Sequence, residues 1–270
     1  MSSKDKIVIA FDLYGTLLST ESIAKELATH FGQEQANKIA ALWRRYQLEY
    51  TWRMNSMTLY KPFSEITSAA LKHALLESSV SLTDEDISKL MKAYNNLGTF
   101  PDVKPGLDAI TSDPSIDAYV FSNGSDEMVS SSVNESPSLS AHASVFKGLV
   151  TVQEIEVFKP DPTVYHHLVR KVGKSFGNED MASVWLVSGN PFDIVGARAA
   201  GINAAWVDRG AGHSGNGGWT DQLGTLASGG PTIIVSGVEE AVKGIKKFMA
   251  EDAGGSVAGH NSESVEMGPG

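Results

Sequence analysis

The sequence predicts an α/β fold, a doubly wound parallel sheet with a helical cap inserted after its first strand. Two observations support this prediction. Short apolar runs recur along the chain and alternate with amphipathic segments, which is the pattern of a parallel sheet covered by helices. The stretch 19–97 carries almost no strand pattern and shows the helical period instead, which indicates a separate group of helices.

The expected strands are short apolar runs, each followed by polar turn residues. The first, Ile7–Phe11, is β-branched and stops before Tyr14-Gly15-Thr16. Later strands are expected at 118–121, 184–187, 204–207 and 232–235. In doubly wound sheets ligands bind just beyond the carboxyl ends of the strands. The polar residues after these runs are therefore candidates for a site.

The chain is expected to divide into three parts. Residues 1–18 and 98–250 form the core, 19–97 the cap, and 251–270 a tail. Cap helices are predicted at 21–31, 35–57, 63–77 and 84–96. The tail is rich in Gly, Ser and Ala without aromatic residues, so we expect disorder. The Ser-rich stretch 125–144 and the Gly-rich stretch 210–230 are expected to be surface loops.

Composition narrows the function classes. With 41% apolar and 20% charged residues the chain is an ordinary globular protein, and with no cysteine it has no disulfide or thiolate metal site. A formal net charge of −10 without a dense basic cluster argues against nucleic acid and membrane partners. The first residues contain too short an apolar run for a signal peptide, so a cytoplasmic location is expected.

Four short motifs stand at or near predicted strand ends, in the order FDLYGT, SNG, KPDP and SGNPFD. Each alone is ordinary turn or helix-cap chemistry. Their combination in this order is specific. Together with LWRRYQLEYTW in the cap, they resemble the haloacid dehalogenase (HAD) superfamily, and more closely its L-2-haloacid dehalogenases.

This resemblance implies a Rossmann-like core with a helical cap. It also implies hydrolysis of short L-2-haloacids to D-2-hydroxy acids, through an ester on Asp12, with no metal or organic cofactor. Two departures separate the chain from the superfamily's phosphatases: Tyr14 and Gly189 stand where those enzymes carry aspartates that serve as acid or help to hold magnesium. No metal site is therefore expected. Members of the family often form homodimers.

The resemblance also implies roles for single residues. Asp12 is the nucleophile, Lys159 keeps it ionised, and Asp193 activates the water that hydrolyses the ester. Arg44 receives the departing halide, with Asn123 as its partner. The remaining candidates are the hydrogen-bonding shell Thr16, Ser188 and Asn190; the carboxylate site of Ser122 with the backbone N–H groups of Leu13 and Asn123; the apolar pocket of Tyr14, Leu48, Phe63 and Phe192; and Arg45, which stands where bacterial members usually carry glutamine.

Two alternatives stay open from the sequence. One is a phosphatase of the same superfamily acting on a small phosphoester, which the missing aspartate at Tyr14 disfavours. The other is a non-catalytic descendant that binds a small carboxylate or a protein partner. That alternative leaves the joint presence of Asp12, Arg44, Lys159 and Asp193 unexplained.

Overall fold

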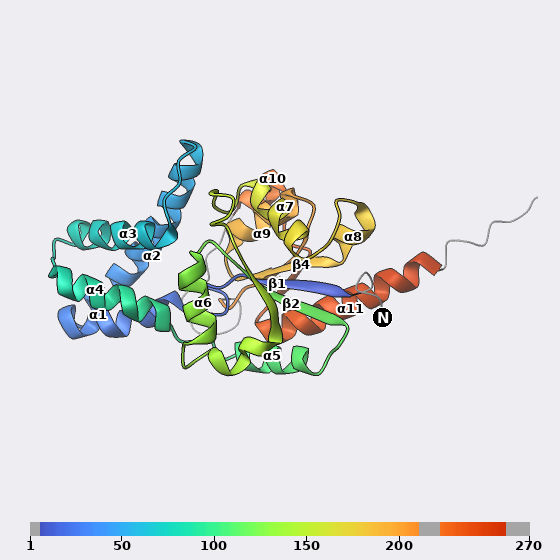
Figure 1. Cartoon of the computed structure of the whole chain (residues 1–270), viewed down its shortest axis with the longest axis horizontal. Coiled ribbons are helices and arrows are strands. Elements are labelled where there is room, and N and C mark those ends of the chain that lie inside the picture. Colours follow the sequence, from blue (N-terminus) through green and yellow to red (C-terminus); the bar gives the residue numbers. More distant parts are fainter. Residues whose placement is uncertain (1–5, 211–221, 258–270) are drawn as a thin grey trace, which may run out of the picture.

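The computed structural model describes residues 6–210 and 222–257 (Figure 1). Within them a six-stranded parallel sheet has the order β3-β2-β1-β4-β5-β6. The strands are β1 (Ile7–Phe11), β2 (Ile116–Ser122), β3 (Phe146–Thr151), β4 (Val184–Ser188), β5 (Asn203–Val207) and β6 (Ile233–Val235). The chain runs from β1 outward to β3 and then returns to the other side of β1. The strand order therefore reverses beside β1, where such sheets bind ligands.

The central strands are apolar because helices cover both faces of the sheet. Every residue of β4, and all but the first of β1, is buried. Phe11 pairs with Val120 of β2 on one side and with Val187 of β4 on the other. This register brings the residues that follow β1, β2 and β4 together at one edge.

Helices form the two outer layers. In Figure 1, α7, α9 and α10 lie above the sheet, and α5 and α11, which pack on each other, lie below it. The core helices are α5 (Val103–Thr111), α6 (Asp126–Asn134), α7 (Pro162–Lys171), α8 (Asn178–Ala182), α9 (Pro191–Ala199), α10 (Leu223–Ala227) and α11 (Val238–Val257), with the 3-10 helix η4 (Ser140–Val145).

A group of helices stands beside the sheet at the left of Figure 1. It consists of η2 (Thr20–Ile23), α1 (Ala24–Phe31), α2 (Gln33–Ser56), α3 (Phe63–Glu77), α4 (Asp84–Ala93) and η3 (Tyr94–Asn96). Helix α2 packs on both α1 and α3, and the buried Trp43 donates its Nε1–H to the Thr67 carbonyl at 2.8 Å. The chain enters and leaves this group through paired segments, where Ser19 N donates to Gly98 O.

Four expectations about local structure were wrong. Strand β3 was missed, because Lys147 and Gly148 interrupt its apolar pattern. The stretch 125–144 contains α6 and η4, since Ser125 caps α6 by accepting a hydrogen bond from Met128 N. Helix α10 lies in the stretch 210–230, of which 211–221 are outside the described residues. Helix α11 continues to Val257, beyond the expected start of the tail at Glu251, because no proline interrupts it. Residues 258–270 of the tail are not described.

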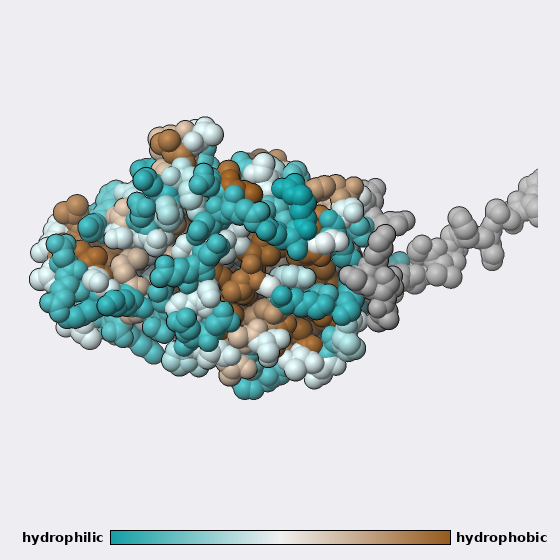
Figure 2. Space-filling view, viewed as in Figure 1, coloured by the Kyte–Doolittle hydropathy of each residue, from teal (hydrophilic) through white to brown (hydrophobic). Residues whose placement is uncertain are grey.

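Among the described residues no helix has the length and apolarity needed to cross a bilayer. The face seen in Figure 2 is mostly polar, with scattered apolar patches. One patch lies at the projecting turn between α2 and α3, where Met57 and Leu59 are each more than half exposed.

Candidate active site

Asp12 follows the last residue of β1, and its backbone N–H still donates to Val187 O of β4. The side chain is buried, and its two oxygens have different surroundings. Oδ2 accepts hydrogen bonds from Asn190 Nδ2 at 2.6 Å, Thr16 Oγ1 at 2.7 Å and Ser188 Oγ at 3.3 Å. Oδ1 accepts one from Lys159 Nζ at 3.2 Å. Oδ1 is therefore the oxygen with a lone pair available to a substrate carbon.

Lys159 links the two carboxylates of the site. Its Nζ also donates to Asp193 Oδ2 at 2.8 Å and to Phe121 O at 2.9 Å, and the side chain is only 1% exposed. One ammonium thus neutralises part of the charge of two buried carboxylates and fixes their positions.

Asp193, in the first turn of α9, is completely buried. Burial, reinforced by the charge of Asp12, raises the pKa of Asp193 to about 6, although the hydrogen bonds from Lys159 and Tyr165 oppose this shift. The Tyr165 hydroxyl donates to Asp193 Oδ1 at 2.8 Å. Tyr165 was not predicted from the sequence, because a tyrosine on the apolar face of α7 has no local feature that separates it from core packing.

The SNG motif follows β2. Ser122 and Asn123 both line the cavity beside Asp12. The Ser122 hydroxyl accepts a hydrogen bond from Gly124 N at 3.0 Å, and Asn123 Oδ1 accepts one from Lys159 N at 2.9 Å. These bonds fix both side chains at the cavity wall.

Arg44 reaches from α2 across to the sheet. Its guanidinium donates to Gln47 Oε1 at 2.7 Å, Tyr14 O at 3.0 Å and Asn190 Oδ1 at 3.1 Å. All three acceptors are neutral, so none of these bonds cancels the positive charge. Gln47, also missed from the sequence, holds the arginine and accepts from the Tyr94 hydroxyl as well.

These groups surround a small cavity. Ten residues line it, and the sequence analysis had named all of them as candidates: Asp12, Tyr14, Arg44, Leu48, Phe63, Ser122, Asn123, Lys159, Asn190 and Phe192. Tyr14 stacks on Phe63 with ring centroids 5.9 Å apart, and Phe192 meets Trp52 edge to face at 5.3 Å. The free space is about 10 Å³, no more than the roughly 10–15 Å³ that one water needs.

Five predicted site residues lie outside this lining. Thr16, Ser188 and Asp193 stand behind it and contact Asp12 or Lys159. Leu13 is fully buried. Arg45 is not brought to the cavity: it is exposed, its guanidinium carbon lies 5.3 Å from the Tyr46 ring, and it lines a different pocket.

Tyr14 and Gly189, which stand where the superfamily's phosphatases carry aspartates, lie in the loops after β1 and β4. The Tyr14 carbonyl accepts hydrogen bonds from Arg44 Nη2 and Asn190 Nδ2, both at 3.0 Å. A Cβ at Gly189 would lie 2.6 Å from Gly15 O, closer than real Cβ contacts, so an aspartate there requires the loops to move apart. The donor set therefore does not suit a magnesium ion. The described residues contain no cluster of three or more metal-binding side chains.

Arg209, after β5, connects the loop that follows β1 with the segment at the start of α5. It forms a two-bond ion pair with Asp102, at 2.8 and 2.9 Å, and donates to Thr16 O at 2.8 Å. Its guanidinium carbon lies 3.8 Å from the centre of the Phe100 ring. The sequence predicts a strand at 204–207, but no local pattern indicates this contact of the residues that follow it.

Known proteins with similar sequences identify the family. The haloacid dehalogenase-like hydrolase family model matches residues 8–201. An (S)-2-haloacid dehalogenase 4A of Burkholderia cepacia is 34% identical over 74% of this chain and 81% of its own length. An (S)-2-haloacid dehalogenase of Pseudomonas sp. (strain YL) is 32% identical over 74% and 82%.

The fold has a close counterpart among solved structures. The L-2-haloacid dehalogenase of Xanthobacter autotrophicus superposes with a TM-score of 0.75 and 25% identity, over 89% of this chain and 98% of that one. The family match covers well over half of the chain, and the Burkholderia and Pseudomonas relatives are both more than 30% identical to it. The chain belongs to the haloacid dehalogenase-like hydrolase family, as its motifs led us to expect.

Proposed function

We propose that this enzyme hydrolyses short L-2-haloacids to D-2-hydroxy acids. The observation that carries the proposal is the unequal environment of the two Asp12 oxygens. In the first step Oδ1 attacks the carbon that bears the halogen, a C–O bond forms, and the halide leaves with the electron pair of the C–halogen bond. Attack from the side opposite the halogen inverts the carbon.

The same asymmetry supports the second step. Once Oδ1 is the ester oxygen, Oδ2 is the carbonyl oxygen. Its donors Thr16, Ser188 and Asn190 are already placed where negative charge develops when water attacks the ester carbonyl. Collapse of that intermediate breaks the bond between the carbonyl carbon and Oδ1. One proton of the water passes to the departing oxygen, which gives the hydroxy acid, and the other is released to solvent as the Asp12 carboxylate is restored. The resemblance implied that Asp193 activates the water. Because Asp193 is fully buried and does not line the cavity, its role in this proposal is to position Lys159.

Arg44 and Ser122 serve different groups of the substrate, the leaving halide and the carboxylate. Arg44 brings a guanidinium with only neutral partners to the cavity, which suits the departing halide. Ser122, with the nearby backbone N–H groups, binds the substrate carboxylate. The buried rings of Tyr14, Phe63 and Phe192 exclude water from the reacting carbon.

The test is halide release from racemic 2-chloropropionate, with chiral chromatography of the product and with p-nitrophenyl phosphate as comparison substrate. We expect only the L enantiomer to react, D-lactate to form, and EDTA to have no effect. A requirement for magnesium together with efficient phosphate release would instead support the phosphatase alternative. The cytoplasmic location and the homodimer stay predictions.

A further inference from the structure

The cavity beside Asp12 is too small for a substrate, and its walls indicate which group moves to admit one. Nine of the ten lining residues are buried, and Arg44 is the one that is partly exposed. Since the free space is too small for a substrate, a lining group has to move before one can enter. Movement of Arg44 breaks three hydrogen bonds to neutral acceptors and no ion pair seen among the described residues.

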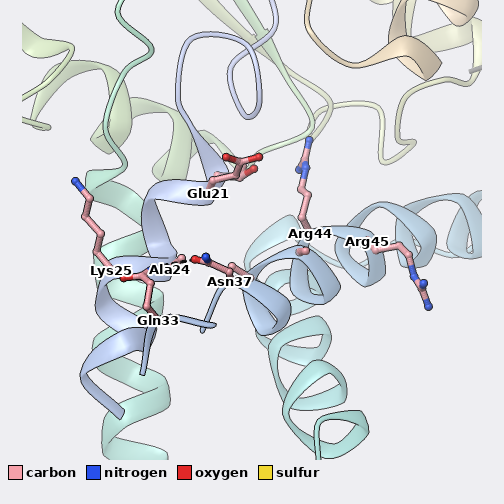
Figure 3. A pocket seen from close by; sticks show the side chains of 10 residues that line it. Glu21, Ala24, Lys25, Gln33, Asn37, Arg44 and Arg45 are labelled. Carbon is pink, nitrogen blue, oxygen red and sulfur yellow. Dashed lines mark hydrogen bonds between the residues drawn. The ribbon is translucent and has the colours of Figure 1, made fainter. Parts of the chain in front are cut away.

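Arg44 also lines a much larger pocket on its other side. This pocket, of about 730 Å³, lies between η2 and α1 on one side and α2 on the other (Figure 3). Its volume is in the range of small-molecule sites. In Figure 3 the Arg44 side chain extends from α2 toward the core, whereas Arg45 points the opposite way. The arginine is therefore shared between the two spaces.

The charges of this pocket suit an anion. Lys25, Arg44 and Arg45 line it together with a single acid, Glu21, in a chain whose formal net charge is −10. A local excess of positive charge raises the concentration of small anions at a cleft. Gln33 Nε2 donates to Asn37 Oδ1 at 2.8 Å, so the Asn37 amino group is the end that can donate to a carboxylate.

We propose that this pocket is an entry vestibule in which a small carboxylate, the 2-haloacid anion, docks before it passes Arg44 to reach Asp12. In Figure 3 the charged ends of Lys25 and Arg45 extend outward on opposite sides, so they attract the anion from the rim of the pocket. The small side chains Ala24, Ala40 and Ala41 leave room for it inside. This inference rests on the proposed function for the identity of the acid. It also gives Arg45 a place in substrate capture, outside the catalytic cavity.

Filling the vestibule tests the proposal. Ala41 is exposed on α2, and Ala41→Trp places a large side chain in the pocket without disturbing the core. We expect kcat/KM for L-2-chloropropionate to fall about tenfold, while the rate of ester formation at saturating substrate stays within about twofold of wild type. Ala69→Trp, at an exposed position of α3 outside the pocket, is the matched control and keeps wild-type kcat/KM.

A second variant tests the charge. Lys25→Glu is expected to lower kcat/KM at low salt, and the difference from wild type should disappear at about 0.5 M NaCl, where surface charges are screened. Lys92→Glu, an equal charge change on α4, should have little effect. If both Ala41→Trp and Lys25→Glu kept the wild-type kcat/KM, the proposal of an entry vestibule would be wrong.

Measurement of propionate binding distinguishes failure of the vestibule proposal from failure of the proposed function. Propionate, which carries no leaving group, can be followed by stopped-flow tryptophan fluorescence in wild type and in Ala41→Trp. If no 2-haloacid is hydrolysed but propionate associates more slowly with the Trp variant, the proposed function fails and the vestibule stands. If hydrolysis proceeds and both proteins bind propionate at the same rate, the vestibule fails alone.

Discussion

The Lys159 ammonium lies 2.8 Å from Asp193, and both side chains are shielded from solvent. A buried carboxylate beside a single ammonium is stable only if the pair stays intact, because removal of either partner leaves an uncompensated charge. The protonation of Asp193, which lies outside the cavity, therefore affects the position of Lys159, which contacts Asp12.

The pH dependence follows from Asp193. Its pKa is raised to about 6 by burial, so protonation below that pH removes the negative partner of Lys159. We expect kcat to fall on the acid side with a midpoint near pH 6. Because the folded protein binds this proton more tightly than the unfolded chain, Asp193 stabilises the fold at low pH. That contribution is lost as pH rises through about 6. A pH profile in which kcat stays constant from pH 5 to 8 would contradict this role.

Replacement of Lys159 by methionine, which is similar in length, should abolish turnover and raise the pKa of Asp193 further. Without the ammonium, neutral Asp193 becomes the favoured form. The free energy of unfolding should therefore fall by roughly 3–5 kcal/mol at pH 8, as for other broken buried ion pairs. At pH 5, where Asp193 is already mostly protonated, the loss should be smaller. Urea denaturation of both proteins at the two pH values measures the difference. An equal loss at both values would show that Asp193 does not depend on Lys159.

The turn at Gly189 should tolerate no side chain. Gly189→Ala places a Cβ against Gly15 O, so we expect the free energy of unfolding to fall by about 1–3 kcal/mol. We also expect a lower kcat, since the adjacent Asn190 contacts Asp12. Gly177→Ala is the matched control, because a Cβ there has no neighbour within 4 Å. Wild-type stability and kcat in Gly189→Ala would show that the two loops can separate freely.

Arg209 is expected to act on Asp12 through Thr16. Arg209→Ala removes the hydrogen bond to the Thr16 carbonyl and the ion pair with Asp102, so kcat should fall about tenfold with little change in KM. Asp102→Asn should have a smaller effect, and the double variant should resemble Arg209→Ala, because the two residues form one unit. Additive effects on kcat would indicate that they act independently.

Much of this architecture could be predicted from the sequence because the core strands and cap helices follow simple periods. The first strand, Ile7–Phe11, was predicted with its observed bounds, and all ten residues of the cavity wall were among the candidates. Parallel strands bring their carboxyl ends together, so residues that follow separate strands meet without any local signal.

Other features depended on contacts through space. Arg45 was assigned to the site with its neighbour Arg44, but adjacent residues of a helix point about 100° apart, so only one of the two reaches the cavity. Tyr165 and Arg209 act on residues far away in the sequence, Asp193 and Thr16, which no local pattern reveals. The edge strand β3 has a half-exposed, glycine-interrupted pattern that resembles a loop.

The central claim, that Asp12 carries the substrate as an ester, is tested most directly by one labelled turnover. Excess enzyme reacts with L-2-chloropropionate in water enriched in the heavy oxygen isotope, and mass spectrometry then examines both the lactate and the peptide that contains Asp12. Because water attacks the ester carbonyl, we predict that the label enters the Asp12 carboxylate and that lactate from this first turnover carries none. Label in the lactate, with Asp12 unlabelled, would mean that water attacks the substrate carbon directly and would contradict the account.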